Sequence, residues 1–86
     1  MNNARVAKAL HTIAVLLEIK GENPFKVRSY ANAAQRIEKL DEPVTVLLEE
    51  GRLRSLEGIG EALEKKVEEF LKTGEIAYLN TLTENY

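Results

Sequence analysis

The sequence LEGIGEALEKKVEEFLK at residues 56–72 decides how the fold is interpreted. Its second part places apolar residues on one face of an amphipathic helix: Leu63, Val67, Phe70 and Leu71. In front of this helix, Gly58 and Gly60 allow a tight turn in which a second backbone can approach closely. The stretch therefore predicts a hairpin that leads into an amphipathic helix.

Helical patterns also surround this stretch. The spacing of apolar residues predicts helices at residues 4–20, 24–40, 44–50, 61–72 and 75–82. Asn23-Pro24 provides an N-cap followed by proline at the first helical position, and Gly21, Gly51 and Gly74 are placed to end helices. The phenylalanines Phe25 and Phe70 are expected in the core. Because no alternation of strand length is visible, we expect an all-α compact bundle of four main helices plus a short C-terminal helix.

Length and composition exclude several classes of protein. With 86 residues, the chain is expected to form a single domain over residues 1–86, too small for an enzyme with its own substrate domain. The sequence has no cysteine and one histidine, His11, which excludes a thiolate nucleophile and a multi-histidine metal site. No apolar run approaches the ~20 residues of a membrane span. A small cytoplasmic binding module is the expectation.

The formal net charge of −2 hides a difference between the two halves of the chain. Residues 1–40 carry seven Lys/Arg and three Glu, whereas residues 41–86 carry five Lys/Arg and eleven Asp/Glu. Nucleic-acid-binding domains usually have a basic total charge. Any contact with DNA must therefore be a local patch or a cradle of backbone groups.

The predicted hairpin offers such a cradle. The first N–H groups of a helix have no intrahelical partner and carry a partial positive charge, which makes them suited to bind an anion. Lys65 and Lys66 follow one turn later and add positive charge. The simpler alternative is that the glycines only form a tight turn between helices.

The pattern Leu-x-Gly-Ile-Gly followed after five residues by lysine resembles a helix-hairpin-helix DNA-binding motif. Two further stretches, GENPFKVRSYANAA at residues 21–34 and EEFLKTG at residues 68–74, make the resemblance more specific. Together they resemble the N-terminal domain of bacterial and archaeal family X DNA polymerases, over about residues 4–82. The chain is more distantly similar to the small lyase domain of DNA polymerase beta.

The resemblance implies a module that binds gapped or nicked DNA in repair or replication, without reading sequence. It implies that the hairpin, with Gly58, Ile59 and Gly60, grips the backbone, and that a basic pocket takes a 5′-phosphate. The residues implied for that pocket and its surroundings are Lys26, Tyr30, Arg54, Lys65 and Lys66. Any polymerase site would belong to a C-terminal region outside these 86 residues.

The resemblance also implies a monovalent cation, Na⁺ or K⁺, at the hairpin. Its ligands would be the backbone carbonyl groups of Arg54, Leu56 and Ile59. No other cofactor is expected.

An enzymatic alternative is that Lys66 forms a Schiff base with a 5′-deoxyribose phosphate, as in the polymerase beta branch. The chain departs from that branch at several positions: Phe25, Ala31, Asn32, Glu57, Ala62 and Tyr78. A lysine that attacks an aldehyde must be neutral, and the nearby Glu64, Glu68 and Glu69 are expected to oppose this. Binding without catalysis is therefore preferred. A third alternative is a protein-interaction bundle that has lost DNA binding, which the acidic residues 41–86 would suit.

Overall fold

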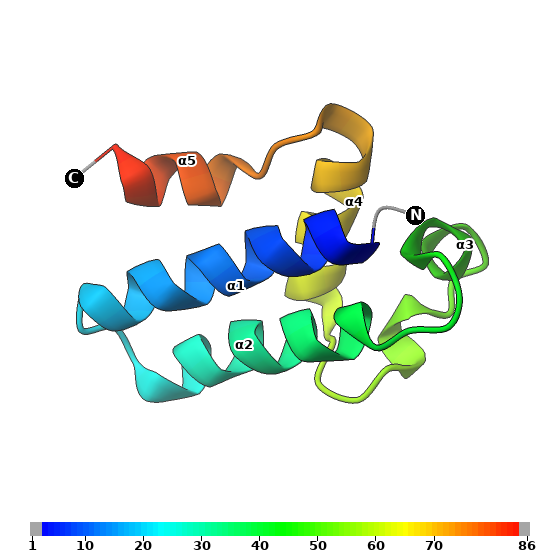
Figure 1. Ribbon diagram of the computed structural model, residues 1–86, viewed down its shortest axis with the longest axis horizontal. Helices are drawn as coiled ribbons and strands as arrows, with labels where there is room; N and C mark the ends of the chain where they lie inside the picture. The colour runs from blue at the N-terminus through cyan, green and yellow to red at the C-terminus, as the bar shows by residue number, and fades with distance from the viewer. Residues whose placement is uncertain (1–2, 85–86) are drawn as a thin grey trace.

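The computed structural model describes residues 3–84, which form helices and contain no strand. The elements in chain order are α1 (Asn3–Ile19), α2 (Pro24–Glu38), α3 (Val44–Glu49), the 3₁₀ helix η1 (Leu53–Ser55), α4 (Glu61–Thr73) and α5 (Ala77–Thr83). Helices α1 and α2 lie antiparallel, α5 lies along the other side of α1, and α4 crosses between these layers (Figure 1). The all-α bundle expected from the sequence is confirmed.

The α1–α2 turn follows the local signals in the sequence. Gly21 adopts a φ of +74°, a left-handed conformation that ends α1 without the steric penalty a side chain would bring. Asn23 then caps α2, because its side-chain oxygen accepts a hydrogen bond from the Phe25 N–H at 2.8 Å. Pro24 occupies the first helical position, where no N–H is needed. These residues set the antiparallel α1–α2 pair that carries one wall of the site.

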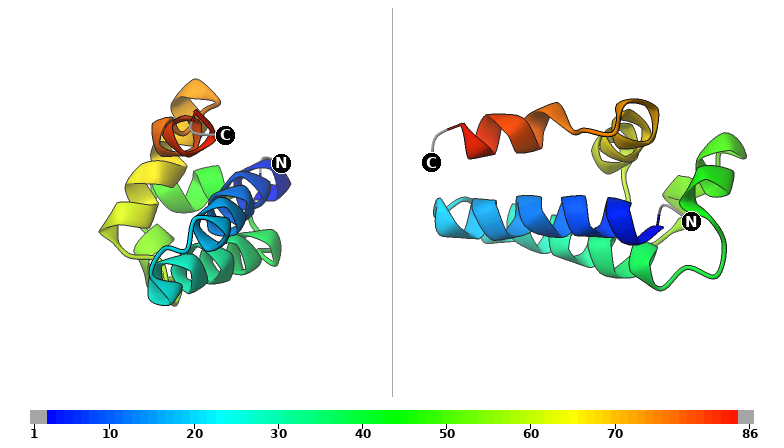
Figure 2. Two further views of the ribbon diagram at one scale, coloured as in Figure 1. Left: turned by 90° about the vertical axis from the view of Figure 1, so that its left-hand side faces the viewer. Right: turned by 45° about the horizontal axis from the view of Figure 1, so that its top comes forward.

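Helix α1 is the centre of the hydrophobic core. Its predicted apolar face is fully buried at Val6, Leu10, Ile13 and Leu17. The other elements pack around this face, as two further views show (Figure 2). Their largest fully buried side chains are Ile37, Val44, Leu53, Val67 and Ile76. Each such side chain contributes about 1.5–3 kcal/mol through burial, so the core fixes how α2 and α4 face each other.

The start of α3 is held by a side chain from the first residue of α1. The Asn3 side-chain oxygen accepts a hydrogen bond from the Val44 N–H at 2.8 Å, and its amide group donates to the Glu42 carbonyl at 2.7 Å. Pro43, the residue before α3, offers no side-chain cap of its own. Asn3, which is 5% exposed, therefore supplies the cap from α1.

Some expectations need correction. Phe25 is not in the core, since it is 75% exposed. At about 100° per residue, Phe25 points about 140° away from Tyr30, which lies on the inward stripe of α2. Helix α2 ends at Glu38, and α5 begins at Ala77 because the residue before it, Ile76, is extended. Within residues 3–84, no helix has the length and hydropathy that crossing a bilayer requires.

Candidate functional site

The hairpin between η1 and α4 is anchored by one buried side chain. Ile59 is 4% exposed and packs in the core, whereas Gly58 and Gly60 on either side are exposed. The turn is closed by a hydrogen bond from the Ile59 N–H to the Leu56 carbonyl at 3.2 Å. This arrangement confirms the expected hairpin, with Ile59 inward and the glycines at the surface.

The two glycines serve different purposes. Gly58 has a φ of +89°, a backbone conformation that residues other than glycine rarely adopt. Gly60 has a φ of −98° and a ψ of −170°, an extended conformation open to any residue. Gly60 is the N-cap of α4 and provides no side-chain cap, so the first N–H groups of that helix are left for another acceptor. A side chain at Gly60 would meet no atom within 4 Å and would project into the open space beside these donors.

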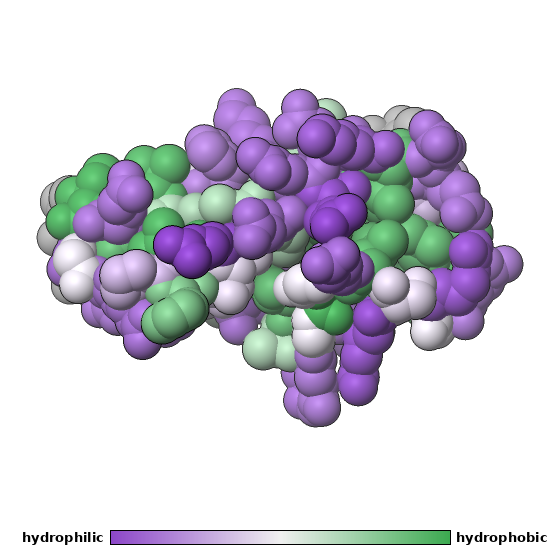
Figure 3. All heavy atoms as spheres, turned by 90° about the horizontal axis from the view of Figure 1, so that it is seen from below, coloured by the Kyte–Doolittle hydropathy of each residue, from purple (hydrophilic) through white to green (hydrophobic). Residues whose placement is uncertain are grey.

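A groove of about 310 Å³ connects the hairpin to α2. Its lining residues are Lys26, Ser29, Tyr30, Gly58, Gly60, Ala62 and Leu63. Seen from the side on which α2 and the hairpin lie, the surface is mainly hydrophilic, with smaller apolar areas between the polar side chains (Figure 3). The groove thus brings the predicted second-helix residues beside the predicted anion-binding hairpin.

Tyr78 of α5 joins the lysines of two other helices. The Lys26 ammonium group lies 5.0 Å from the centre of the Tyr78 ring, and the Lys66 ammonium group lies 5.2 Å from the same centre. Both distances are within the range of cation–π attraction. The Tyr30 ring lies against the Tyr78 ring, with centres 6.2 Å apart. The structure therefore brings Lys26, Tyr30 and Lys66 together around Tyr78, and we call these four residues the tyrosine–lysine cluster.

The carboxylates near Lys66 have other partners. Glu64 accepts a hydrogen bond from Arg54 at 3.1 Å, Glu68 lies 3.8 Å from Lys72, and Glu69 accepts from the Ala77 N–H at 2.8 Å. Among residues 3–84, no carboxylate oxygen lies within 4.0 Å of the ammonium group of Lys26 or Lys66. The two lysines of the cluster are therefore available for an external anion.

The cluster also sets the protonation of two of its members. A hydrogen-bonding interaction with Tyr78 raises the pKa of Lys26 above its ordinary value, and the charge of Glu22 adds to this effect. Burial raises the pKa of Tyr30 to about 12, with a smaller contribution from Tyr78. Near neutral pH, Lys26 is therefore a cation and the Tyr30 hydroxyl keeps its proton, so both can donate hydrogen bonds to an anion.

Comparison with known proteins identifies the family of the chain. The helix-hairpin-helix domain family matches residues 1–76. The chain belongs to this family. It is also 34% identical over 82 residues to the DNA polymerase/3′-5′ exonuclease PolX of Bacillus subtilis (strain 168). The match covers 95% of this chain and 14% of the Bacillus protein, so the chain spans only a small part of that relative's length.

Of the predicted residues Arg54, Lys65 and Lys66, none lines the groove itself, but Lys66 contacts the Tyr78 ring whereas Arg54 and Lys65 are paired with carboxylates. Arg54 is not among the residues that line the groove, since its guanidinium group is held by Glu64 at 3.1 Å and lies 3.9 Å from Glu61. Lys65 is 3.3 Å from Glu61 in an i,i+4 pair. Both side chains are mostly exposed and their charges are already matched. The monovalent cation at the carbonyls of Arg54, Leu56 and Ile59 stays a prediction.

The role of Tyr78 was not predicted from the sequence, in which Tyr78 is only one of the departures from the polymerase beta branch. Its ring is half-buried and organises both lysines. The two-residue extended segment before α5 turns that helix back along α1, and this packing brings Tyr78 to α2. No local spacing signal relates position 78 to positions 26 and 66.

Proposed function

We propose that this helix-hairpin-helix domain binds DNA through its phosphate backbone, without preference for sequence, as a module related to family X DNA polymerases. The family match and the similarity to PolX support this. The exposed hairpin supports it physically, because uncapped N–H groups at the start of α4 are donors suited to phosphate oxygens. A larger protein with a polymerase region, acting in DNA repair, is the context we propose for the domain.

We further propose that the tyrosine–lysine cluster binds the 5′-phosphate at a gap or nick. The observation that carries this proposal is the position of Lys26 and Lys66 on one tyrosine ring. Lys26 also lines the hairpin groove, and neither lysine has a carboxylate partner among residues 3–84. Tyr30 is 6% exposed but lines the groove, so its protonated hydroxyl is a further donor there. A terminal phosphate carries more charge than a backbone phosphate, and this favours it at two adjacent cations.

A titration of gapped duplex DNA with and without a 5′-phosphate tests the proposal. The wild type should bind the phosphorylated gap more tightly, and Lys66→Ala should lose about 1–2 kcal/mol of binding to that DNA alone. Lys72→Ala is the matched control, because Lys72 lies on the same helix and is paired with Glu68. Equal loss on both DNAs would contradict the 5′-phosphate site. No salt-dependent binding to either DNA would instead favour a protein-interaction bundle.

A lyase reaction through Lys66 is the second candidate. The observation that favours it is that Glu64, Glu68 and Glu69 are engaged with other partners. The unprotonated amine would attack the aldehyde of a 5′-deoxyribose phosphate, and loss of water would form the Schiff base. Borohydride trapping on abasic DNA tests this candidate. An adduct that disappears in Lys66→Ala but persists in Lys65→Ala would make the domain a lyase, whereas no adduct would leave binding as its function.

A further inference from the structure

A second groove lies on the other side of the hairpin, at the outward face of α2. It has a volume of about 380 Å³ and is lined by Asn32, Gln35, Arg36, Lys39, Glu57 and Gly58. Gly58 lines both this groove and the groove that Lys26 and Tyr30 line, so the hairpin tip lies between the two. The groups that α2 contributes to this groove are neutral amides, a guanidinium group and an ammonium group, all of which can donate hydrogen bonds. Glu57 is the one carboxylate among the lining residues.

The Glu57 carboxylate forms an ion pair with Arg36. One Glu57 oxygen accepts a hydrogen bond from an Arg36 nitrogen at 3.2 Å, and this is a single contact rather than a bidentate pair. The side chains are 52% exposed for Arg36 and 87% exposed for Glu57. Exposed single contacts of this kind are weak, so a stronger anion can displace the carboxylate. Lys39 has no carboxylate oxygen within 4.0 Å among the described residues.

We infer that this second groove is a phosphate subsite for the DNA backbone, and that Glu57 is a built-in competitor for it. In the free domain the Glu57 carboxylate forms an ion pair with the Arg36 guanidinium group. When a DNA strand crosses the hairpin, a backbone phosphate displaces the carboxylate and contacts Arg36 and Lys39. The inference rests on the proposed DNA binding and adds to it a contact on the opposite side of the hairpin from the tyrosine–lysine cluster.

Charge and position make the DNA backbone the fitting occupant. The first N–H groups of α4 follow Gly60, which lines the first groove, and Gly58 lines both grooves, so a strand held at these donors has neighbouring phosphates within reach of the second groove. A planar guanidinium group binds a phosphate in a bidentate manner, which the single contact with Glu57 does not use. Glu57 therefore lowers the affinity of the domain for DNA, since its charge must move away from the incoming phosphate.

The test compares DNA binding of the wild type and Glu57→Gln over a range of salt concentrations, with unphosphorylated gapped duplex as the probe. We expect Glu57→Gln to bind about three- to five-fold more tightly at low salt. The slope of log affinity against log salt should become more negative by up to about 0.9, because in the wild type the displaced Glu57 carboxylate offsets one of the cations that neutralise phosphates. Adding Arg36→Gln to Glu57→Gln should abolish the gain.

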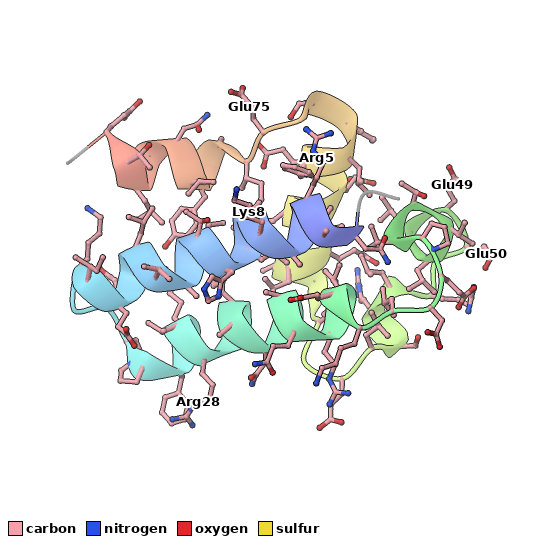
Figure 4. The ribbon with its side chains drawn as sticks, viewed as in Figure 1. Arg5, Lys8, Arg28, Glu49, Glu50 and Glu75 are labelled. Carbon is pink, nitrogen blue, oxygen red and sulfur yellow. The ribbon has the colours of Figure 1, made fainter. Side chains whose placement is uncertain are left out.

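Glu75→Gln is the matched control for charge, because it removes the same charge at the far end of α4 from the hairpin (Figure 4). Its affinity gain should be smaller, with an unchanged slope. The inference is overturned if Glu57→Gln gains no more than Glu75→Gln, or if the double variant keeps the gain. Circular dichroism melts should show that each variant is folded, because the side chains of Arg36 and Glu57 are exposed.

If the wild type itself fails to bind DNA, the proposed function falls together with the inference. If the wild type binds and only the Glu57 result fails, the inference falls alone.

Discussion

The tyrosine–lysine cluster and the α3–η1 segment use positive charge in opposite ways. In the α3–η1 segment, Arg52 contacts Glu42 at 2.9 Å and also pairs with Glu50, while Arg54 contacts Glu64 at 3.1 Å. In the cluster, Lys26 and Lys66 lie on an aromatic ring with no carboxylate within ion-pair distance among residues 3–84. Lys66 comes from the acidic half of the chain, so the charge of a segment does not indicate where available cations lie. A cation is available where no carboxylate lies within ion-pair distance of it.

The largest expected effect comes from removing both lysines of the cluster. Lys26→Ala combined with Lys66→Ala should weaken binding to 5′-phosphorylated gapped DNA by about 2–4 kcal/mol, because each lysine contributes one charge-assisted contact. The control is Arg52→Ala combined with Lys72→Ala, which removes the same charge from ion-paired positions. This control should bind within about three-fold of the wild type. Similar losses in both double variants would mean that total charge, rather than the cluster, governs affinity. Fluorescence anisotropy titrations measure both.

The next effect concerns the hairpin. Gly60→Val should keep the fold, since Gly60 is extended and its surroundings are open, but should weaken DNA binding by about 1.5–3 kcal/mol. The reason is that a side chain there obstructs the N–H donors at the start of α4. Gly58→Val should in addition destabilise the domain, because φ at Gly58 is +89°. A folded Gly60→Val variant with unchanged affinity would remove the hairpin from the interface.

A smaller effect is the dependence of stability on alkaline pH. Burial raises the pKa of Tyr30 to about 12, whereas an unfolded tyrosine titrates near 10. Between these values the unfolded chain loses the proton that the folded domain retains, so the free energy of unfolding should fall as pH rises from about 10 to about 12. Urea unfolding at several pH values should show a weaker fall in Tyr30→Phe. An equal fall in both proteins would mean that Tyr30 has the same pKa in the folded and unfolded states.

The smallest effect should come from the ion pairs of the α3–η1 segment. Arg52 lowers the pKa of Glu42, so this pair contributes stability above the ordinary titration range of glutamate and loses it in acid. Both side chains are close to half exposed, which limits the contribution. Arg52→Ala should shift the melting temperature at neutral pH by only a few degrees. A large shift would mean that this segment, rather than the α1-centred core, limits stability.

Local signals were enough to predict the helices, the cap of α2 by Asn23 and the hairpin. The sequence could also predict the inward position of Ile59, because it lies within the hairpin motif. It could predict the i,i+4 ion pairs Glu61–Lys65 and Glu68–Lys72, because both members of each pair lie on one helix. The cap of α3 by Asn3, 41 positions from Val44, could not. The joining of Lys26 and Lys66 by Tyr78 likewise depends on how three helices pack. Phe25 was placed in the core because it is apolar, although its position on the helix wheel directs it to solvent.

An amide chemical-shift titration of the domain with 5′-phosphorylated gapped DNA compares the two regions most directly. We expect the amides of Gly58 to Ala62 and of the first two turns of α2 to shift early in the titration. Those of α3, Val44–Glu49, should stay unchanged at saturation. Removal of the 5′-phosphate should reduce the shifts near Lys26 and Lys66 while leaving those of the hairpin. Shifts centred on α3 and η1, with the hairpin unchanged, would contradict the account.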